Sequence, residues 1–221
     1  MKYGTVKLIH IVSLWLAATL IAANVHAQIN EAIDHAGIGV GVAHYNPTSD
    51  DGQTSQGIVA AYRWHSFHSG WGPTFGLDFH TTDFNETLGG LNAHLGSYRM
   101  RALLAGFGHT RHMGRFSAAA NLLGGYAFNS FNVEGDAFPA FAATGVSLVG
   151  AHVDNSWVVK PGVNVWYDVL KHVGVGVGAA YLVSRPELTI TTASGTQQQH
   201  LKTDAFEATA GVTFGLWRNK P

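Results

Sequence analysis

Residues 204–217, with the sequence DAFEATAGVTFGLW, alternate apolar side chains with small or polar ones along the segment. Because successive side chains of a β-strand point to opposite faces, this pattern predicts a strand with two unlike faces. The apolar face carries Phe206, Ala208, Ala210, Val212, Phe214 and Leu216, and the other face carries Glu207, Thr209, Gly211, Thr213 and Gly215. The apolar face has to contact either a protein core or lipid, and the rest of the chain must distinguish these environments.

Seven other segments show the same period of two, which predicts further strands. They are residues 37–45, 57–66, 74–82, 97–109, 115–128, 157–168 and 173–184. Segment 97–109 is the least regular. Its two arginines are expected to face inward, so that its outer face consists of Tyr98, Met100, Ala102 and Leu104. Pro161 interrupts segment 157–168, and because proline cannot donate a backbone hydrogen bond we expect a bend or bulge there.

The connections between these segments alternate between short and long. The short ones are 67–73, 110–114 and 169–172, and the long ones are 46–56, 83–96, 129–156 and 185–203. Outer-membrane barrels have tight periplasmic turns, longer outer loops and an even number of strands. The sequence therefore predicts an all-β fold, an eight-stranded antiparallel transmembrane up-and-down β-barrel, with a soluble lipocalin-like binding barrel as the alternative. Residues 191–199, rich in Thr and Gln, are expected to be mobile and solvated.

The composition narrows the classes of function. Charged residues make up 12% of the 221 residues, whereas soluble domains contain about 25%. The formal net charge of -1, with no basic cluster, argues against nucleic-acid binding. The chain has no cysteine, which excludes disulfides and thiolate metal sites, and we expect no cofactor.

The start of the chain is predicted to be a secretory signal peptide. Lys2 and Lys7 precede an apolar run over residues 8–23, and small residues at Val25 and Ala27 are typical of a signal peptidase site. An uncleaved N-terminal membrane anchor is the alternative. The expected division of the chain is a cleaved signal peptide (1–27), a short periplasmic segment (28–36), the barrel (37–217) and a periplasmic tail (218–221).

The final predicted strand also carries a motif. It combines a polar residue, a glycine and spaced apolar or aromatic residues, namely Thr209, Gly211, Phe214 and Leu216. With this motif, the mature chain resembles the small eight-stranded outer-membrane β-barrels of the OmpA/OmpX type, the outer membrane protein beta-barrel domain family. The resemblance implies a location in the cell outer membrane, contact with outer-membrane lipids and recognition of the last strand by the outer-membrane assembly machinery. Relatives usually stop at a terminal aromatic residue, whereas this chain continues from Trp217 to Pro221.

A closed barrel of eight strands has an interior that side chains just fill, so we expect no open pore. The predicted polar network of this interior consists of Asp78, His80, Arg99, Arg101, Arg115, Lys160, Asp168 and Glu207. Strand directions place the first four together, Arg115 beside Asp168, and Lys160 beside Glu207. Because buried charges must be paired, these groups form either a satisfied polar plug, which we favour, or an ion-pair gate for a narrow conductance.

The 13 histidines raise the question of a metal site. His65 and His68 share one predicted turn, and His109 and His112 lie at the next, so their imidazoles could converge on one rim. No histidine pair has the spacing of a helical metal site. We therefore expect no bound metal.

An enzymatic role needs a nucleophile, a base and an orienting acid within reach of one another. His80, Ser97 and Glu86 are the candidates for a barrel that modifies lipid A, but nothing in the sequence fixes their mutual geometry. We expect no enzyme activity. The expected function is a structural or cell-surface contact protein acting through its long outer loops, and the alternatives are a narrow gated channel, a lipid A-modifying enzyme and a soluble binding barrel.

Overall fold

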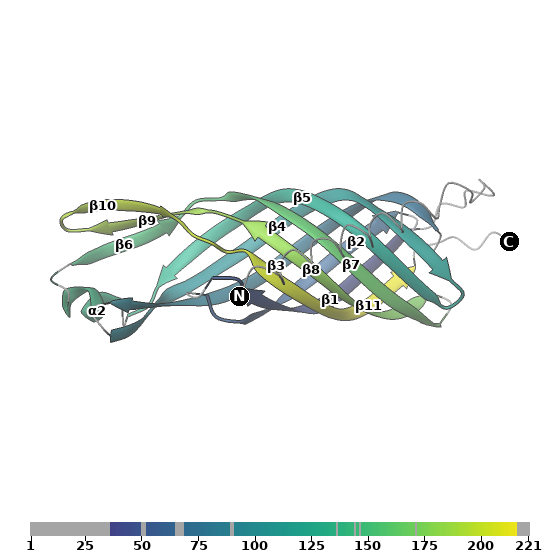
Figure 1. The fold of residues 1–221 in the computed structure, drawn as a ribbon, viewed down its shortest axis with the longest axis horizontal. Coiled ribbons are helices and arrows are strands. Elements are labelled where there is room, and N and C mark those ends of the chain that lie inside the picture. The colour runs from purple at the N-terminus through teal and green to yellow at the C-terminus, as the bar shows by residue number, and fades with distance from the viewer. Residues whose placement is uncertain are drawn as a thin grey trace, which may run out of the picture. The chain divides into compact units, whose positions relative to one another are not determined.

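The computed structural model describes residues 36–49, 52–64, 69–88, 91–135, 137–143, 145, 147–170 and 172–215. Within these ranges, eight strands form a closed barrel in the order β1-β11-β8-β7-β5-β4-β3-β2 (Figure 1). Their bounds are β1 Ala36–Pro47, β2 Ser55–Trp64, β3 Gly70–Leu88, β4 Leu91–Met113, β5 Phe116–Val133, β7 Ser156–Leu170, β8 Val173–Ser184 and β11 Ala205–Gly215. Neighbouring strands are antiparallel, so the predicted fold is confirmed. The expected signal peptide and the tail 218–221 lie outside the described residues.

The barrel closes between its first and last strands. Gly37 of β1 pairs with Gly215 of β11, and the register continues without interruption along both strands. The other edge of β11 pairs with β8, so neither end of the sheet is left as a free edge. The segment that predicts the fold is therefore the strand that completes it. Leu216 and Trp217, at its expected end, lie outside the described residues.

The outer face of the barrel is apolar. Phe206 and Phe214 of β11 are 61% and 43% exposed, whereas Glu207, next to Phe206, is 3% exposed. Exposed apolar residues on the other seven barrel strands include Val40, Ile58, Phe79, Leu103, Leu122, Val163 and Val177. An apolar surface that surrounds a closed barrel on every strand is stable against lipid and unfavourable in water.

The hairpin of β3 and β4 is longer than the sequence predicts. These strands contain 19 and 23 residues, and their pairing continues as far as Leu88 and Leu91. The expected long connection 83–96 is therefore mostly strand, with a register irregularity between Phe84 and Asn85. The sequence predicts shorter strands because residues 83–96 lack a regular alternation of apolar and polar side chains.

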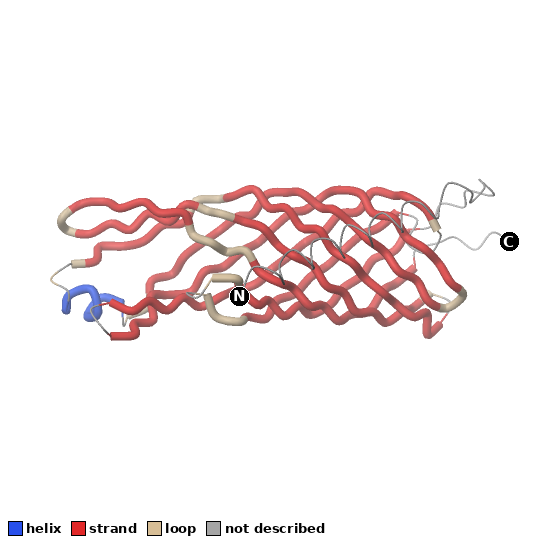
Figure 2. Tube along the Cα trace, viewed as in Figure 1, coloured by secondary structure: helices blue, strands red, loops and turns tan. Residues whose placement is uncertain are grey.

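Two other long connections contribute a second sheet with the order β10-β9-β6. Its elements and the adjacent helix are α2 Ala137–Ala143, β6 Leu148–Val153, β9 Glu187–Thr192 and β10 Gly195–His200. Figures 1 and 2 show these strands continuing beyond one end of the barrel. Residues 191–199, expected to be a mobile loop, mostly belong to the paired strands β9 and β10. In the described part of the chain, no helix has the length and apolar content needed to cross a membrane.

Pro161 interrupts one ladder without shifting its register. The pairing of β7 with β8 skips Lys160 and Pro161 and resumes at Gly162 in the same register. The expected bulge at Pro161 is therefore not found. The irregularity of this strand pair lies instead between Asp168 and Leu170, next to the short connection from β7 to β8.

Two adjacent glycines of β5 test the close packing of the barrel wall. A Cβ atom on Gly125 would collide with the backbone oxygen of Leu103, whereas the nearest atom to a Cβ on Gly124 is the Val158 oxygen at 3.9 Å. We expect Gly125→Ala to lower the free energy of unfolding by about 1–3 kcal/mol, as overpacking does.

The matched variant Gly124→Ala should change that free energy by less than about 0.5 kcal/mol. Urea unfolding of both variants in lipid vesicles measures the difference. Equal stability of the two variants would contradict the close approach of β4 and β5 at Gly125.

Candidate functional site

We call the half of the barrel interior next to the long connections the outer half, and the half next to the short connections the inner half. The outer half is filled by apolar side chains. Tyr98 and Met100 of β4 are completely buried. The centroids of the Phe84 and Tyr98 rings lie 6.1 Å apart, and the ring planes form an angle of 90°. The same cluster includes Val158, Leu182, Val153 and Leu188. The last two belong to β6 and β9, so the second sheet contributes to the packing at the outer end of the lumen.

Below this cluster, a lysine joins two carboxylates across the lumen. Lys160 Nζ donates to Asp78 Oδ2 at 2.7 Å and to Glu207 Oε1 at 2.9 Å. The three residues are 8%, 1% and 3% exposed, respectively. Their strands β7, β3 and β11 are not neighbours in the sheet, so the contacts pass through the lumen and link separate parts of the barrel wall. We call these three residues the lysine cluster. It contains the expected pair of Lys160 with Glu207, and Asp78 as a third member.

An aromatic pair lies close to the lysine cluster. The His80 ring stacks on Tyr45 with centroids 4.1 Å apart and an angle of 27°. Both residues are buried, and His80 Nδ1 has no hydrogen-bond partner in the described structure. His80 is thus in the lumen as expected, but its contacts are aromatic and it meets no arginine.

The expectation that Arg99 and Arg101 face the interior is wrong. Both are exposed on the outer face of β4, whose lumen-facing residues are instead Tyr98, Met100, Ala102 and Leu104. Arg101 pairs with Phe128 on β5, beside the outward ring of Tyr126, which packs against Phe128 at 5.4 Å. Charged heads are tolerated at such an aromatic girdle because they reach polar head groups.

The expected ion pair between Arg115 and Asp168 is also not formed. Arg115 is exposed at the start of the β5 hairpin, and its Nη1 atom donates to the Tyr167 hydroxyl at 3.4 Å. Asp168 faces the lumen at the inner rim, where its Oδ1 atom is buried without a hydrogen-bond partner in the described structure. The two side chains diverge because Tyr167 and Asp168 are adjacent on β7 and point to opposite faces.

The inner half of the lumen contains a cavity of about 170 Å³. Its lining includes the lysine cluster at one end and Gly37 and Thr213 at the inner ends of β1 and β11. Between them, small inward residues such as Gly39, Gly76, Gly162, Gly176 and Gly211 form the wall. The expectation of a completely filled interior therefore holds for the outer half only. In the inner half, glycines occupy inward positions and contribute no side chain that could fill the space.

Sequence reasoning missed two large lumen residues beside this cavity. Arg63 of β2 and Trp166 of β7 are 9% and 6% exposed, and the Arg63 guanidinium lies 5.7 Å from the centroid of the Trp166 ring. The signal was present, because alternation places each of them on the face opposite to apolar neighbours. Neither belonged to a predicted charge pair, so neither was included in the network.

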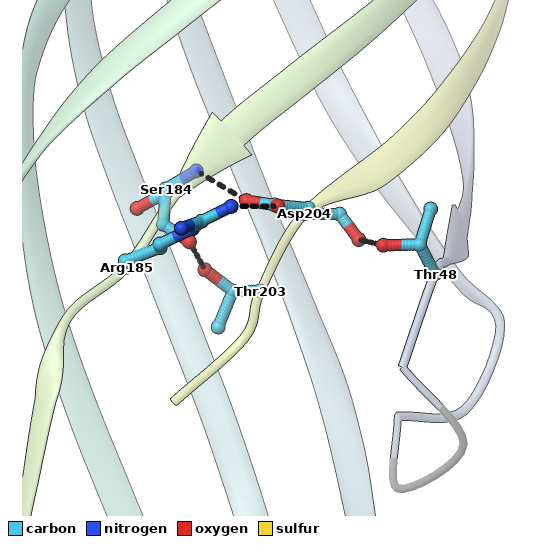
Figure 3. Close-up of polar contacts among 5 residues, drawn as sticks. All are labelled: Thr48, Ser184, Arg185, Thr203 and Asp204. Carbon is cyan, nitrogen blue, oxygen red and sulfur yellow. Dashed lines mark hydrogen bonds and ion pairs between the residues drawn. The ribbon is translucent and has the colours of Figure 1, made fainter. Parts of the chain in front are cut away.

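At the outer rim, Asp204 ties three strands together (Figure 3). Its Oδ1 atom accepts from the Ser184 backbone N–H at 3.1 Å, and its Oδ2 atom lies 3.4 Å from Arg185 Nη2. Its backbone oxygen accepts from the N–H and the hydroxyl of Thr48, at 2.9 and 3.0 Å. The Thr203 hydroxyl donates to the Ser184 backbone oxygen at 2.8 Å. We call this group the rim clasp, and it holds the outer ends of β1, β8 and β11.

The histidines that can be placed do not converge. His109 faces outward, with its ring 5.1 Å from Trp71, whereas His112 Nδ1 lies 2.6 Å from the inward Ser117 hydroxyl. His65 and His68 lie outside the described residues. Among the described residues, no group of three potential ligands could hold a metal ion.

The three residues considered for catalysis are not assembled either. His80 is buried in the lumen, and Ser97 lies on the opposite face of the wall, because Tyr98 next to it points inward. The Glu86 side chain is outside the described part of the structure. A serine and a histidine on opposite faces of one sheet cannot exchange a proton directly.

The closed barrel, its apolar outer wall and its charged interior together define an integral outer-membrane β-barrel. Several solved structures share this fold. The outer membrane protein OprG from Pseudomonas aeruginosa has a TM-score of 0.70 and 12% identity, over 86% of this chain and 99% of that one. AlkL, determined in DMPC lipid bilayers, has a TM-score of 0.54 and 12% identity, over 90% and 99% of the two chains.

A major outer membrane protein from Thermus thermophilus also has a TM-score of 0.54 and 12% identity, over 82% of this chain and 99% of that one. No protein-family model and no curated protein matches the sequence. At these identities the similarity shows the fold alone. The expected resemblance to small eight-stranded outer-membrane barrels is confirmed at that level.

The lysine cluster predicts a large effect of one substitution. Lys160→Met would leave Asp78 and Glu207 buried without their cation, and we expect the free energy of unfolding to fall by about 3–5 kcal/mol. The triple variant with Asp78→Asn and Glu207→Gln removes the unpaired charges and should regain much of that loss. Urea unfolding in lipid vesicles measures both variants. A triple variant no more stable than Lys160→Met would show that charge pairing is not the cause.

The rim clasp predicts a smaller effect. Asp204→Ala leaves the Ser184 N–H without its acceptor, and we expect a loss of about 1–3 kcal/mol in the free energy of unfolding. Asp204→Asn keeps an acceptor oxygen and should lose less. Folded barrels migrate differently from unfolded ones in detergent gels until the sample is heated. The temperature at which each variant changes its migration ranks the stability of the variants. If Asp204→Asn were as unstable as Asp204→Ala, the charge facing Arg185 would be the main contribution.

Proposed function

We propose that the protein is a closed outer-membrane barrel that makes contacts at the cell surface through its outer extensions. The main support for this proposal is that side chains cross the lumen at two positions along the barrel axis. Apolar side chains fill the outer half, and the lysine cluster crosses the lumen below them. An interior occupied in this way favours a role for the outer surface over the passage of solutes.

The second sheet supports a contact role because it presents a strand edge. β10 pairs with β9 on one side only, in the sheet order β10-β9-β6, and all six of its residues are exposed. Gln197, Gln198 and Gln199 add side-chain donors and acceptors along this strand. Exposed edges of this kind can pair with a strand of another protein.

The proposal includes two membrane partners. Arg99 and Arg101, beside the outward aromatic residues, have the position and charge for contact with anionic head groups of outer-membrane lipids. The last strand remains the expected contact for the outer-membrane assembly machinery. Thr209 and Gly211 of that strand face the lumen and Phe214 faces outward, whereas Leu216 lies outside the described residues.

A narrow gated channel is the second candidate, and the inner cavity favours it. Conduction would require both the lysine cluster and the apolar outer cluster to move aside. Asp78→Ala, measured for stability and for current in planar bilayers, separates the candidates. Loss of stability without new current supports the closed barrel, and stable unitary currents in the wild type would overturn it.

We further propose that the barrel is not an enzyme, because His80 and Ser97 lie on opposite faces.

The contact role is tested by changing the edge strand alone. We expect cells carrying Gln197→Lys with Gln199→Lys to be retained severalfold less on surfaces coated with extracellular matrix protein, because charged edge strands oppose strand addition. The matched variant with serine at both positions keeps a neutral edge and should be retained like the wild type. Equal retention of cells with and without the wild-type protein would contradict the proposal.

A further inference from the structure

The inner half of the lumen contains buried donors that lack acceptors. The indole Nε1 of Trp166 and the Oγ1 of Thr213 are buried without a hydrogen-bond partner in the described structure. Arg63 uses its Nε atom to donate to Thr74 Oγ1 at 3.3 Å and places its guanidinium near the Trp166 ring. All four residues line the same cavity of about 170 Å³. We call Arg63, Trp166 and Thr213 the donor cluster.

Arg63 also lacks a counter-charge. Among the described residues it forms no ion pair: Asp78 and Glu207 contact Lys160, Asp204 faces Arg185, and the Asp168 carboxylate lies near Thr213. A cation that is 9% exposed and meets only a hydroxyl and an aromatic ring is poorly compensated. The Arg63 guanidinium is therefore a buried cation that could accept an anionic ligand.

We propose that the donor cluster binds a small organic monocarboxylate, with Arg63 as the cation and with Trp166 and Thr213 as neutral donors. The planar guanidinium matches a carboxylate, which it can bind through two parallel hydrogen bonds. The glycine-lined wall leaves room for a short apolar tail beside the head group. This binding is independent of the contact role proposed for the outer surface.

The charges around the cluster select the charge of the ligand. Asp168 faces the same inner lumen, and a Cβ atom on Gly174 would lie 2.7 Å from Thr213 Oγ1 and 3.2 Å from Asp168 Oδ1. Asp168 is therefore near Thr213, and its negative charge weakens the binding of any anion there. A singly charged ligand is favoured over doubly charged phosphate because the cost of removing an anion from water rises with the square of its charge, whereas its attraction to one guanidinium rises only in proportion.

The site is at the end of the lumen that faces the periplasm. Arg63 lies one residue before the end of β2, and the cavity continues to Gly37 at the start of β1. The lysine cluster forms the opposite end of the cavity. The lysine cluster therefore lies between Arg63 and the outer end of the lumen.

The indole resonance of Trp166 provides the measurement. The full-length mature protein, labelled with ¹⁵N in detergent micelles, is titrated with propionate, chloride or phosphate at constant ionic strength, and the Trp166→Phe variant assigns the resonance. We expect propionate to cause a saturable shift of the Trp166 indole resonance. Chloride and phosphate should bind more weakly, by about tenfold or more, because only a carboxylate combines a single charge with two oxygens that accept parallel hydrogen bonds from the guanidinium.

Variants assign the binding to named groups. Arg63→Met should weaken propionate binding by about tenfold or more, because it removes the charged donor, and Arg63→Lys should restore part of the affinity. Asp168→Asn should strengthen binding. Heat-modifiable migration shows whether each variant is folded. If Arg63→Met does not fold, Thr213→Val, which removes one donor at nearly constant volume, should weaken binding severalfold.

Three outcomes would overturn the proposal. The first is the lack of any saturable propionate shift in the wild type. The second is an unchanged affinity in both Arg63→Met and Thr213→Val. The third is chloride or phosphate binding as tightly as propionate, which would exclude a carboxylate site.

Discussion

The backbone of a chain in lipid must satisfy its own hydrogen bonds, because the hydrocarbon core offers no donors or acceptors. In this protein the pairing of β1 with β11 meets that requirement by closing the sheet. The apolar outer face, the alternation of every barrel strand and the enclosed lumen follow from this closure. Without it, both strands would present free edges to lipid.

Closure also decides what the interior can hold. Lys160 can reach Asp78 and Glu207 only because β3, β7 and β11 face one another across a narrow lumen. The two halves of that lumen differ in the size of their inward side chains. Tyr98 and Met100 belong to the filled outer half, whereas inward glycines leave the inner half with its cavity. One barrel therefore combines a packed outer section with a polar inner pocket.

The outer end shows how strand pairing continues beyond the lipid-facing wall. The β3 and β4 hairpin extends as far as Leu88 and Leu91, and β9 pairs with both β6 and β10. Asp204 links the outer ends of β1, β8 and β11 through backbone hydrogen bonds and its carboxylate. The extensions therefore start from a rim that is held by specific contacts.

The sequence by itself determined the number of barrel strands and the two faces of most of them. The period of two in residues 204–217 is a local property of the chain, and it correctly places Glu207 inside and Phe206 outside. The same alternation places Lys160 and Asp78 on lumen faces.

Only the tertiary structure decided which face of β4 points inward and which charged groups meet. Alternation states that Arg99 and Arg101 share a face, but not whether that face is the lumen, because both faces of this strand carry apolar residues. The contacts of Lys160 with Asp78, of Arg63 with Trp166 and of Asp204 with Thr48 join residues distant in sequence. They depend on the stagger and closure of the barrel, which no local pattern encodes.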